Sequence, residues 1–491
     1  MNDLANSFGT TYGARILTLF QICILASICE FAGAVSLGGA VTSTISGGIA
    51  STDNFKSEPY LFMYGMLCAS GAAFLWLAVA TYYVLPVSST HSIVGGVIGF
   101  ALVHGGKSSV KWASPASDFP YFGGVAPVIA SWFISPLLTG VVTAILYCSV
   151  KYAVLMHQNS VKRAVWALPI IVGFAFFLES FLILFKGAAK RLHWKVGKAL
   201  WVSAIIGAGV AAVTCALVPL MKRLIRRRQR ERAEAEAAAA AEPIGDGHST
   251  RSGARASARA GDESGNALPP VDAAAKPGAV PSAEGAVVRD DDESDDAGAA
   301  ASDVAVEVPA DPHADVMRYD NDAEYIFRYL QVFTAMCASF AHGASDVSNA
   351  VGPFAAIYGI YQSGSVTFSK NTPIWILCIG GAGLVVGLST FGIRLMRLLG
   401  ETITLITPSR GFSAELAAAL VVSFASGYGI PVSSTHCITG GVVAVSIIDK
   451  GFMNINWKMV LKMYFGWVFT LVITAVMSAA FYAQGAYSPI E

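Results

Sequence analysis

The stretch "LPVSSTHSIVGGVIG" at residues 85–99 is written a second time as "IPVSSTHCITGGVVA" at residues 430–444. Six consecutive residues, PVSSTH, are identical in the two copies, and a GG pair follows each at the same distance. A proline followed by Ser-Ser-Thr ends one helix and supplies the hydroxyl and N–H groups with which another can begin. The chain therefore contains a duplicated helix break.

An Asp/Asn phrase precedes each copy. The first is "NDLANSFGT", which contains Asp3, and the second is "GASDVSNAVGP", which contains Asp346. Asp3 lies 83 residues before Pro86, and Asp346 lies 85 residues before Pro431. Two motifs in the same order at nearly equal spacing indicate a tandem duplication of the whole unit.

The composition is that of an integral membrane protein. Of 491 residues 54% are hydrophobic and only 13% are charged, and the mean hydropathy is +0.56. The formal net charge is zero, so no nucleic-acid partner is expected. The eight cysteines lie in apolar surroundings without a CxxC pair, and we interpret them as small buried hydrophobic residues.

The apolar runs predict an all-α polytopic fold. Runs of about 20 residues can cross the hydrocarbon core, and eight are long enough: 14–37, 60–85, 124–149, 165–185, 199–221, 373–395, 411–430 and 457–483. Four shorter runs, at 91–104, 329–344, 347–361 and 436–448, suggest broken or re-entrant helices. We expect two homologous repeats with about 10–12 membrane segments in all.

A hydrophilic segment divides the two repeats. Residues 222–324 are rich in Ala, Gly, Ser, Pro and charged residues, which predicts a disordered linker between membrane regions at 1–221 and 325–491. Its first eleven residues hold seven Lys or Arg, which favours a cytoplasmic linker. The loop 186–198 at the other end of the 199–221 run carries five more Lys or Arg. Both ends of a spanning helix cannot be cytoplasmic, and we favour the end with the denser cluster, residues 222–232, as the cytoplasmic one.

The PVSSTH segments are candidate anion sites. Backbone N–H groups and the positive end of a helix dipole stabilise a bound anion. Hydroxyls from both copies could then satisfy a tetrahedral oxyanion, and the alternative is that they cap helices or bond between packed helices. The candidate phosphate-binding residues are Ser88, Ser89, Thr90, Ser433, Ser434 and Thr435.

The Asp/Asn phrases are candidate cation sites. An ionised carboxylate at bilayer depth is costly and needs a partner, yet neither phrase contains Lys or Arg. Carboxylate, amide and hydroxyl oxygens suit a small hard ion such as Na⁺ rather than a transition metal, and a protonated aspartate in a proton-coupled carrier is the competitor. The candidate sodium-binding residues are Asp3, Asn6, Ser7, Asp346, Ser348 and Asn349.

Further titratable residues interrupt the apolar runs. Glu30 and Glu415 are candidates for coupling or gating, and a structural hydrogen bond to Ser or Thr on a neighbouring helix is the alternative for each. His91 and His436 close the PVSSTH segments. We interpret both, and His342, as structural rather than as proton relays.

Together these residues resemble the inorganic phosphate transporter family, PiT, whose eukaryotic members are sodium-coupled type III phosphate carriers. The resemblance includes both phrases, both PVSSTH segments, "LTLFQICILASICEFAGAV" around Glu30 and "ITPSRGFSAELAAALVVSFASGYGIPVSSTHCITGG" around Glu415. It covers nearly all of both hydrophobic halves, and a long hydrophilic loop between the halves is typical of the family.

The resemblance implies inverted-topology repeats, alternating access and a phosphate site shared by the two SSTH segments and the Asp phrase. Sodium ions would lie against Asp3, Asn6, Asp346 and Asn349, and two Na⁺ would balance one divalent phosphate. Ser345 stands where the family usually has Asn. The segment that would precede "NDLANSFGT" is missing, so we expect either a translation start upstream or an incomplete first site.

The leading hypothesis is therefore Na⁺-coupled phosphate symport in an integral membrane protein, with the plasma membrane as the expected location. Proton-coupled symport and a non-transporting phosphate sensor are the alternatives. An enzyme is disfavoured, because the sequence has no P-loop, catalytic triad or metal-ligand cluster. No cofactor is expected beyond co-transported Na⁺ or H⁺; the expected partners are phosphate, sodium ions and the bilayer, with a homo-oligomer open.

Overall fold

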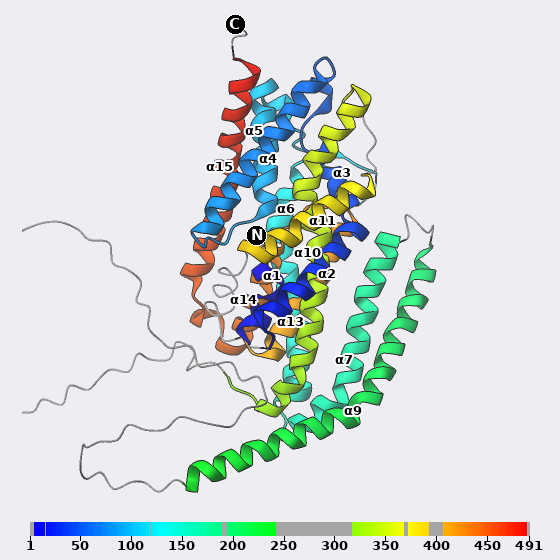
Figure 1. Ribbon diagram of the computed structural model, residues 1–491, viewed down its shortest axis with the longest axis vertical. Coiled ribbons are helices and arrows are strands. Elements are labelled where there is room, and N and C mark those ends of the chain that lie inside the picture. Colours follow the sequence, from blue (N-terminus) through cyan, green and yellow to red (C-terminus); the bar gives the residue numbers. More distant parts are fainter. Residues whose placement is uncertain are drawn as a thin grey trace, which may run out of the picture. The chain divides into compact units, whose positions relative to one another are not determined.

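The computed structural model describes residues 4–14, 16–117, 119–188, 194–241, 317–367, 372–391 and 406–488. It is almost entirely helical (Figure 1). The N-terminal half contains α1 (Leu4–Gly13), α2 (Leu19–Leu37), α3 (Gly39–Gly47), α4 (Pro59–Tyr82), α5 (Ser89–Gly105), α6 (Ala126–Val150), α7 (Ser160–Leu182) and α9 (Val196–Ala241). The C-terminal half contains α10 (Asn321–Ser363), α11 (Ile374–Phe391), α13 (Pro408–Gly427), α14 (Ser434–Lys450) and α15 (Trp457–Ala486).

Short elements join some of these helices. The 3-10 turns are η1 (Thr52–Phe55), η2 (Gly106–Ser109) and η5 (Phe452–Asn454), and the π-helical turns are η3 (Lys151–Leu155) and η4 (Ile183–Ala188). Two strands, β1 (Ser114–Pro115) and β2 (Phe122–Gly123), form an antiparallel pair in which Ser114 faces Gly123.

Among the described residues, six helices are long and apolar enough to cross a membrane: Leu19–Leu37, Pro59–Tyr82, Ala126–Leu155, Ser160–Phe185, Val196–Glu234 and Trp457–Ala486. Each corresponds to a long run predicted from the sequence. The predicted run at 373–395 is represented by a shorter apolar helix, Ile374–Thr390. The run at 411–430 corresponds to α13, whose buried side chains include Arg410 and Glu415, so protein rather than lipid surrounds it.

The duplicated helix breaks are present where the sequence predicts them. Ser88 caps α5 by accepting a hydrogen bond from the backbone N–H of His91 at 3.3 Å, and Ser433 caps α14 by accepting from that of His436 at 3.4 Å. A hydroxyl at this position satisfies one of the N–H groups left free at a helix start. Each PVSSTH segment therefore ends one helix and begins another inside the protein.

The break expected at the second Asp/Asn phrase is wrong. The runs 329–344 and 347–361 belong to one continuous helix, α10, which passes through Asp346 and Pro353 without interruption. Asp320 caps its start, and Gly364, in the left-handed conformation at φ 65°, follows its end. Because α10 packs against α2, α3, α4 and α13 along its length, tertiary contacts outweigh the local cost of the internal proline.

The predicted linker does not begin at Lys222, since α9 continues to Ala241. The chain divides into two compact units, one of 1–230 with 311–491 and one of 231–310. Of the second unit the structure describes only Glu231–Ala241, the end of α9. Most of the predicted linker lies outside the described residues.

Glycine pairs hold the two halves together. A Cβ on Gly95 or Gly99 of α5 would meet the backbone of Leu471 or Ala475 on α15, so these helices lie side by side (Figure 1). The equivalent Gly440 of α14 meets the backbone of α6. Small residues let helix backbones approach closely in membrane proteins. Each half therefore packs its own PVSSTH helix against a helix of the other half, α5 against α15 and α14 against α6.

The two PVSSTH helices start together and end far apart. The ring centroids of His91 and His436, near the two helix starts, are 4.8 Å apart. Beyond the end of α5, the carbonyl of Lys111 accepts a hydrogen bond of 2.8 Å from the residue that precedes α6. At the end of α14, Asp449 pairs at 3.0 Å with Lys151, which follows α6. A helix of 25 residues is ~37 Å long, so α5 and α14 run to opposite ends of α6.

Candidate functional site

The first Asp/Asn phrase contacts the PVSSTH segment of the other half. Asn6, on α1, donates from Nδ2 to Oγ1 of Thr435 at 2.8 Å and to Oγ of Ser434 at 3.3 Å. All three side chains are at least nine-tenths buried. A contact between residues more than 400 positions apart thus joins the start of α1 to the start of α14.

The second phrase makes the reciprocal contact. Asn349, on α10, donates from Nδ2 to Oγ of Ser89 at 3.2 Å and to Oγ1 of Thr90 at 3.4 Å. Ser89 in turn donates to Oδ2 of Asp346 at 3.0 Å. Each asparagine therefore bonds the second hydroxyl and the threonine of the opposite PVSSTH segment, which gives the centre an approximate two-fold pattern.

The six hydroxyls predicted to bind an anion divide into two kinds. Ser88 and Ser433 act as helix caps, which is one of the alternatives left open by the sequence. The other four, Ser89, Thr90, Ser434 and Thr435, lie in the first turns of α5 and α14 against the asparagines. The N–H groups and dipoles of both helix starts point to the same central region, which favours negative charge there.

A cavity of about 330 Å³ opens at the second phrase. Its polar lining includes Ser89, Asp346 and Asn349, and apolar residues of α4 and α11 form much of the remainder. Oδ1 of Asp346 is buried and has no hydrogen-bond partner in the described part of the chain. A carboxylate oxygen, a hydroxyl and an amide thus converge on one space, and these are ligands that a small hard cation accepts.

His342 links two carboxylates inside the protein. Its Nδ1 lies 2.7 Å from Oε2 of Glu30 on α2, and its Nε2 lies 2.8 Å from Oδ2 of Asp346, one helical turn later on α10. The side chains of all three are at least 97% buried. Glu30 also accepts a hydrogen bond of 3.3 Å from Ser339. This bridge was not predicted from the sequence, although the four-residue spacing of His342 and Asp346 is a signal for neighbours on one helix face.

Close packing of α2 on α10 positions this bridge. A Cβ on Gly343 would collide with the backbone of Glu30, and one on Gly33 would collide with the backbone of Phe340. The two helices therefore cross at glycine on both sides, and they run parallel, since Ser339 lies against Ala26 and Val347 lies against Gly38. The crossing brings the Glu30 carboxylate within reach of the histidine that precedes Gly343.

Glu415 is the hydrogen-bonded centre of a threonine cluster. It accepts from Thr10 and, at 3.1 Å, from Thr11 on α1, and it accepts at 2.8 Å from Thr334 on α10. Its exposed fraction is 0%. The cluster ties α13 to α1 and α10. These contacts are the hydrogen bonds to Thr on neighbouring helices that were the structural alternative for Glu415. The signal for them in the sequence was the Thr-Thr pair one turn after Asn6.

The remaining predicted residues that the structure describes are buried. Ser7 is buried on α1, and Ser348 donates its hydroxyl hydrogen to the carbonyl of Ser345 within α10. Asp3 lies outside the described residues. His91 and His436 pack against Trp132 and Trp467 with ring centroids 4.1 and 3.9 Å apart.

Sequence reasoning also missed an ionic cluster at the end of α14. Asp449 accepts from Nε of Arg410 at 2.6 Å and from Nζ of Lys151 at 3.0 Å. Tyr147 donates to the same carboxylate at 2.8 Å. These buried side chains join α6, α13 and α14 at one end of the molecule.

Within the described segments, no group of three His, Cys, Asp or Glu side chains has an arrangement suited to a resident metal ion.

Comparisons with known proteins agree over most of the chain. A model of the phosphate transporter family matches residues 1–478. The phosphate-repressible phosphate permease of Neurospora crassa is 34% identical, with 97% of this chain and 93% of the permease aligned. The sodium-dependent phosphate transporter 1-A of Danio rerio is 30% identical, with 98% and 91% aligned.

A solved structure is also similar. A chain described as the sodium-dependent phosphate transporter superposes with a TM-score of 0.71 at 26% sequence identity. The superposition covers 99% of the present chain and 95% of the other. The similarity thus extends through both halves rather than to one motif.

Proposed function

The chain belongs to the phosphate transporter family, and we propose that it carries inorganic phosphate across a membrane together with Na⁺ by alternating access. The observation that carries the proposal is the reciprocal contact of each Asp/Asn phrase with the opposite PVSSTH segment. This contact brings hydroxyl groups and helix starts from both halves, together with the carboxylate of Asp346, into one interior region. The family is one of transporters, as expected from the sequence, and not of enzymes.

The anion would bind between the starts of α5 and α14. Ser89, Thr90, Ser434 and Thr435 offer hydroxyl donors there, and each helix start adds partial positive charge. Phosphate is a tetrahedral oxyanion that accepts several hydrogen bonds, so two converging helix starts fit it better than one. When phosphate binds, Asn6 and Asn349 would release their hydrogen bonds to these hydroxyls, and the hydroxyls would bond the phosphate instead.

The cation would bind at Asp346. Its Oδ2 accepts a hydrogen bond from Ser89, its buried Oδ1 has no hydrogen-bond partner among the described residues, and no Lys or Arg belongs to the phrase. Because Asp346 shares the single histidine His342 with Glu30, a sodium ion would supply the remaining countercharge for these carboxylates and, when phosphate is present, for the anion as well. Coupling then has a physical cause, because each ligand lowers the electrostatic cost of binding the other.

Alternating access is supported by the directions of the equivalent helices. Because α5 and α14 start together and run to opposite ends of α6, we infer that the repeats have inverted topology. Transporters built from inverted repeats place their sites where interrupted helices meet, and they rock one repeat against the other around that site. The cavity beside Asp346 would then be one access route.

The identity of the coupling ion is open to one direct test. The Danio rerio relative is named sodium-dependent, whereas the name of the Neurospora crassa permease mentions no cation. Uptake of labelled phosphate by intact cells should fall to background when Na⁺ is replaced by choline at constant pH. Undiminished uptake in choline would refute Na⁺ coupling, and a dependence on external acidity instead would favour the proton-coupled alternative.

A sensor without transport is the second candidate, favoured only by the long charged segment between the halves. Uptake in intact cells discriminates the two, since a sensor moves no phosphate.

We propose the plasma membrane as the location because an inward Na⁺ gradient is available there. Surface biotinylation together with uptake tests that placement.

A further inference from the structure

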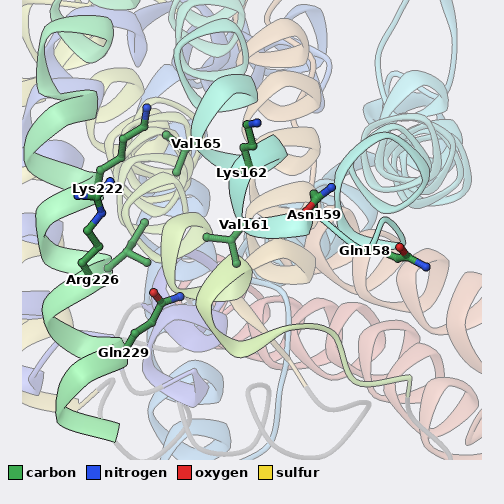
Figure 2. A pocket seen from close by; sticks show the side chains of 9 residues that line it. Gln158, Asn159, Val161, Lys162, Val165, Lys222, Arg226 and Gln229 are labelled. Atoms are coloured by element: carbon green, nitrogen blue, oxygen red, sulfur yellow. The ribbon is translucent and has the colours of Figure 1, made fainter. Parts of the chain in front are cut away.

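A second polar feature lies away from the centre, where the turn before α7 faces the later part of α9. A pocket of about 320 Å³ opens there, and its charged lining consists of Lys162 from α7 and Lys222 and Arg226 from α9 (Figure 2). In the described segments none of the three forms an ion pair with a carboxylate. The pocket therefore presents three positive charges that have no ion-pair partner among the described residues.

Neutral hydrogen-bond groups complete its polar lining. Gln158 and Asn159 precede α7, and Gln229 follows Arg226 by one turn on α9 (Figure 2). Gln229 donates from Nε2 to Asp322 at the start of α10, at 2.9 Å. That bond ties α9 to α10 at one end of the pocket. The cations and amides that line the pocket come from the turn before α7, from α7 and from α9.

The floor of the pocket is apolar and rigid. Val165 and Ile225 are 3% and 5% exposed and belong to the hydrophobic core between α7, α9 and α10, and Val161 packs against that core and also lines the pocket. Long cationic side chains above such a floor keep their stems on apolar atoms and their charges at the mouth. The site thus suits a ligand with an anionic group attached to an apolar part.

The pocket lies at the end of a lipid-facing surface. Trp166, Ile170 and Phe174 follow one face of α7 at four-residue spacing and are 65%, 73% and 52% exposed. The ammonium group of Lys222 lies 5.4 Å from the ring centroid of Trp166. Tryptophan is enriched at the boundary between hydrocarbon and headgroups, where lysine extends toward water. The pocket is therefore at headgroup depth.

The side of the membrane follows from the path of the chain. Tight contact at Gly173 and Gly207 pairs α7 with α9, and the competing basic loop 186–198 joins the other ends of the two helices. The α6–α7 turn adds Lys162 and Arg163 to the same end as the basic cluster of α9. The excess of positive charge at this end makes it cytoplasmic.

We propose that this pocket binds the phosphorylated headgroup of an anionic lipid in the cytoplasmic leaflet. Several cations with amide donors favour a polyvalent phosphate over a single carboxylate, and basic pockets between membrane helices are suited to such headgroups. The acyl chains would follow the exposed face of α7. The lipid would tie α7 to α9 and so influence how far the two helices separate. Lipid binding at this pocket does not depend on whether Na⁺ or H⁺ is the ion coupled to transport.

The test uses the purified full-length protein in detergent and native mass spectrometry. Phosphatidylinositol bisphosphate should bind more tightly than phosphatidylcholine, and Lys222→Gln with Arg226→Gln should weaken its binding at least about tenfold. Arg223→Gln with Arg230→Gln is the matched control, because it removes two charges from exposed positions on the same helix outside the pocket. The control should change binding less than about twofold.

Other outcomes would overturn the proposal. Equal weakening in both double variants would mean diffuse attraction by the basic helix and no pocket. Soluble inositol trisphosphate binding as tightly as the lipid would assign the pocket to a soluble phosphorylated compound, and competition by inorganic phosphate at similar concentration would assign it to free phosphate. The substituted positions are exposed, so each variant should remain folded, and its size-exclusion profile should match that of the wild type.

Discussion

At the scale of single residues, the centre depends on a few buried polar groups whose partners come from distant parts of the chain. Asp346 has one oxygen bonded by Ser89 and near His342, and the other has no hydrogen-bond partner in the described segments. Asn349 orients Ser89 from the same helix face. A buried carboxylate persists only when such groups, or a bound cation, compensate its charge.

Replacing the carboxylate should therefore abolish transport without unfolding the protein. In Asp346→Asn the amide keeps nearly the same volume and can still accept a hydrogen bond from Ser89, but it offers a cation no negative charge. Labelled phosphate uptake should fall at least about tenfold, which corresponds to a rise of ~1.4 kcal/mol or more in the activation free energy of transport.

The matched control is Asp53→Asn, since Asp53 is an exposed residue of η1 whose pKa is lowered by the neighbouring Lys56. That variant should transport like the wild type. Surface biotinylation must show both proteins at the membrane in equal amounts. Uptake by Asp346→Asn equal to that of the control would remove this residue from the proposed cation site.

At the scale of elements, glycines decide which helices touch. The GG pair of each PVSSTH helix performs two tasks: Gly95 and Gly440 meet the partner half, and Gly96 and Gly441 meet Ala69 and Ala414 of the preceding helix in their own half. The pairs are thus equivalent in contact as well as in sequence. Between α2 and α10 the same principle acts through Gly343.

Gly343→Ala should push α2 away from α10. The new methyl group would meet backbone atoms of Glu30, which cannot rotate aside as a side chain can, so we expect a destabilisation of about 1–3 kcal/mol. Thermal unfolding in detergent should show a lower midpoint, and phosphate uptake should fall because the Glu30–His342 contact is lost.

Gly383→Ala on α11 serves as the comparison, because no atom lies within 4 Å of the position its Cβ would take. Its unfolding midpoint should stay the same or rise slightly, since alanine favours a helix over glycine. If both variants unfolded at the same temperature, the close crossing of α2 and α10 would not constrain the fold.

At the scale of the whole molecule, the polar centre lies within one compact unit, made of 1–230 and 311–491. Helices α1 and α10 bring the Asp/Asn phrases, and α14 and α5 bring the opposing hydroxyls. Neither repeat supplies a complete centre by itself. The segment between the repeats contributes no described residue to it.

Replacing residues 242–315 with a flexible Gly/Ser linker should therefore leave phosphate uptake at least half that of the wild type, because all described contacts of the centre remain. The measurement is initial uptake rate normalised to protein at the cell surface. A carrier should pass this test, whereas a sensor that signals through the segment should lose its response. Complete loss of uptake at normal surface expression would show that the segment takes part in transport.

The membrane class, the duplication, the two helix breaks and the residue types of the centre can all be predicted from the sequence. These follow from local composition and spacing: an apolar run must satisfy its backbone in a helix, and proline followed by serine ends one helix and caps the next. Residues such as Asn6, Ser89 and Asp346 could be selected because polar groups are expensive in an apolar chain.

Only the tertiary structure decided how these parts meet. The phrases bond the PVSSTH segment of the opposite half, α10 continues through Asp346 where a break was predicted, and His342 joins Glu30 to Asp346. These features depend on which helix faces lie together, and the packing that selects those faces is shared among many small side chains far apart in the sequence. Local patterns therefore name the groups of the centre, but long-range packing chooses their partners.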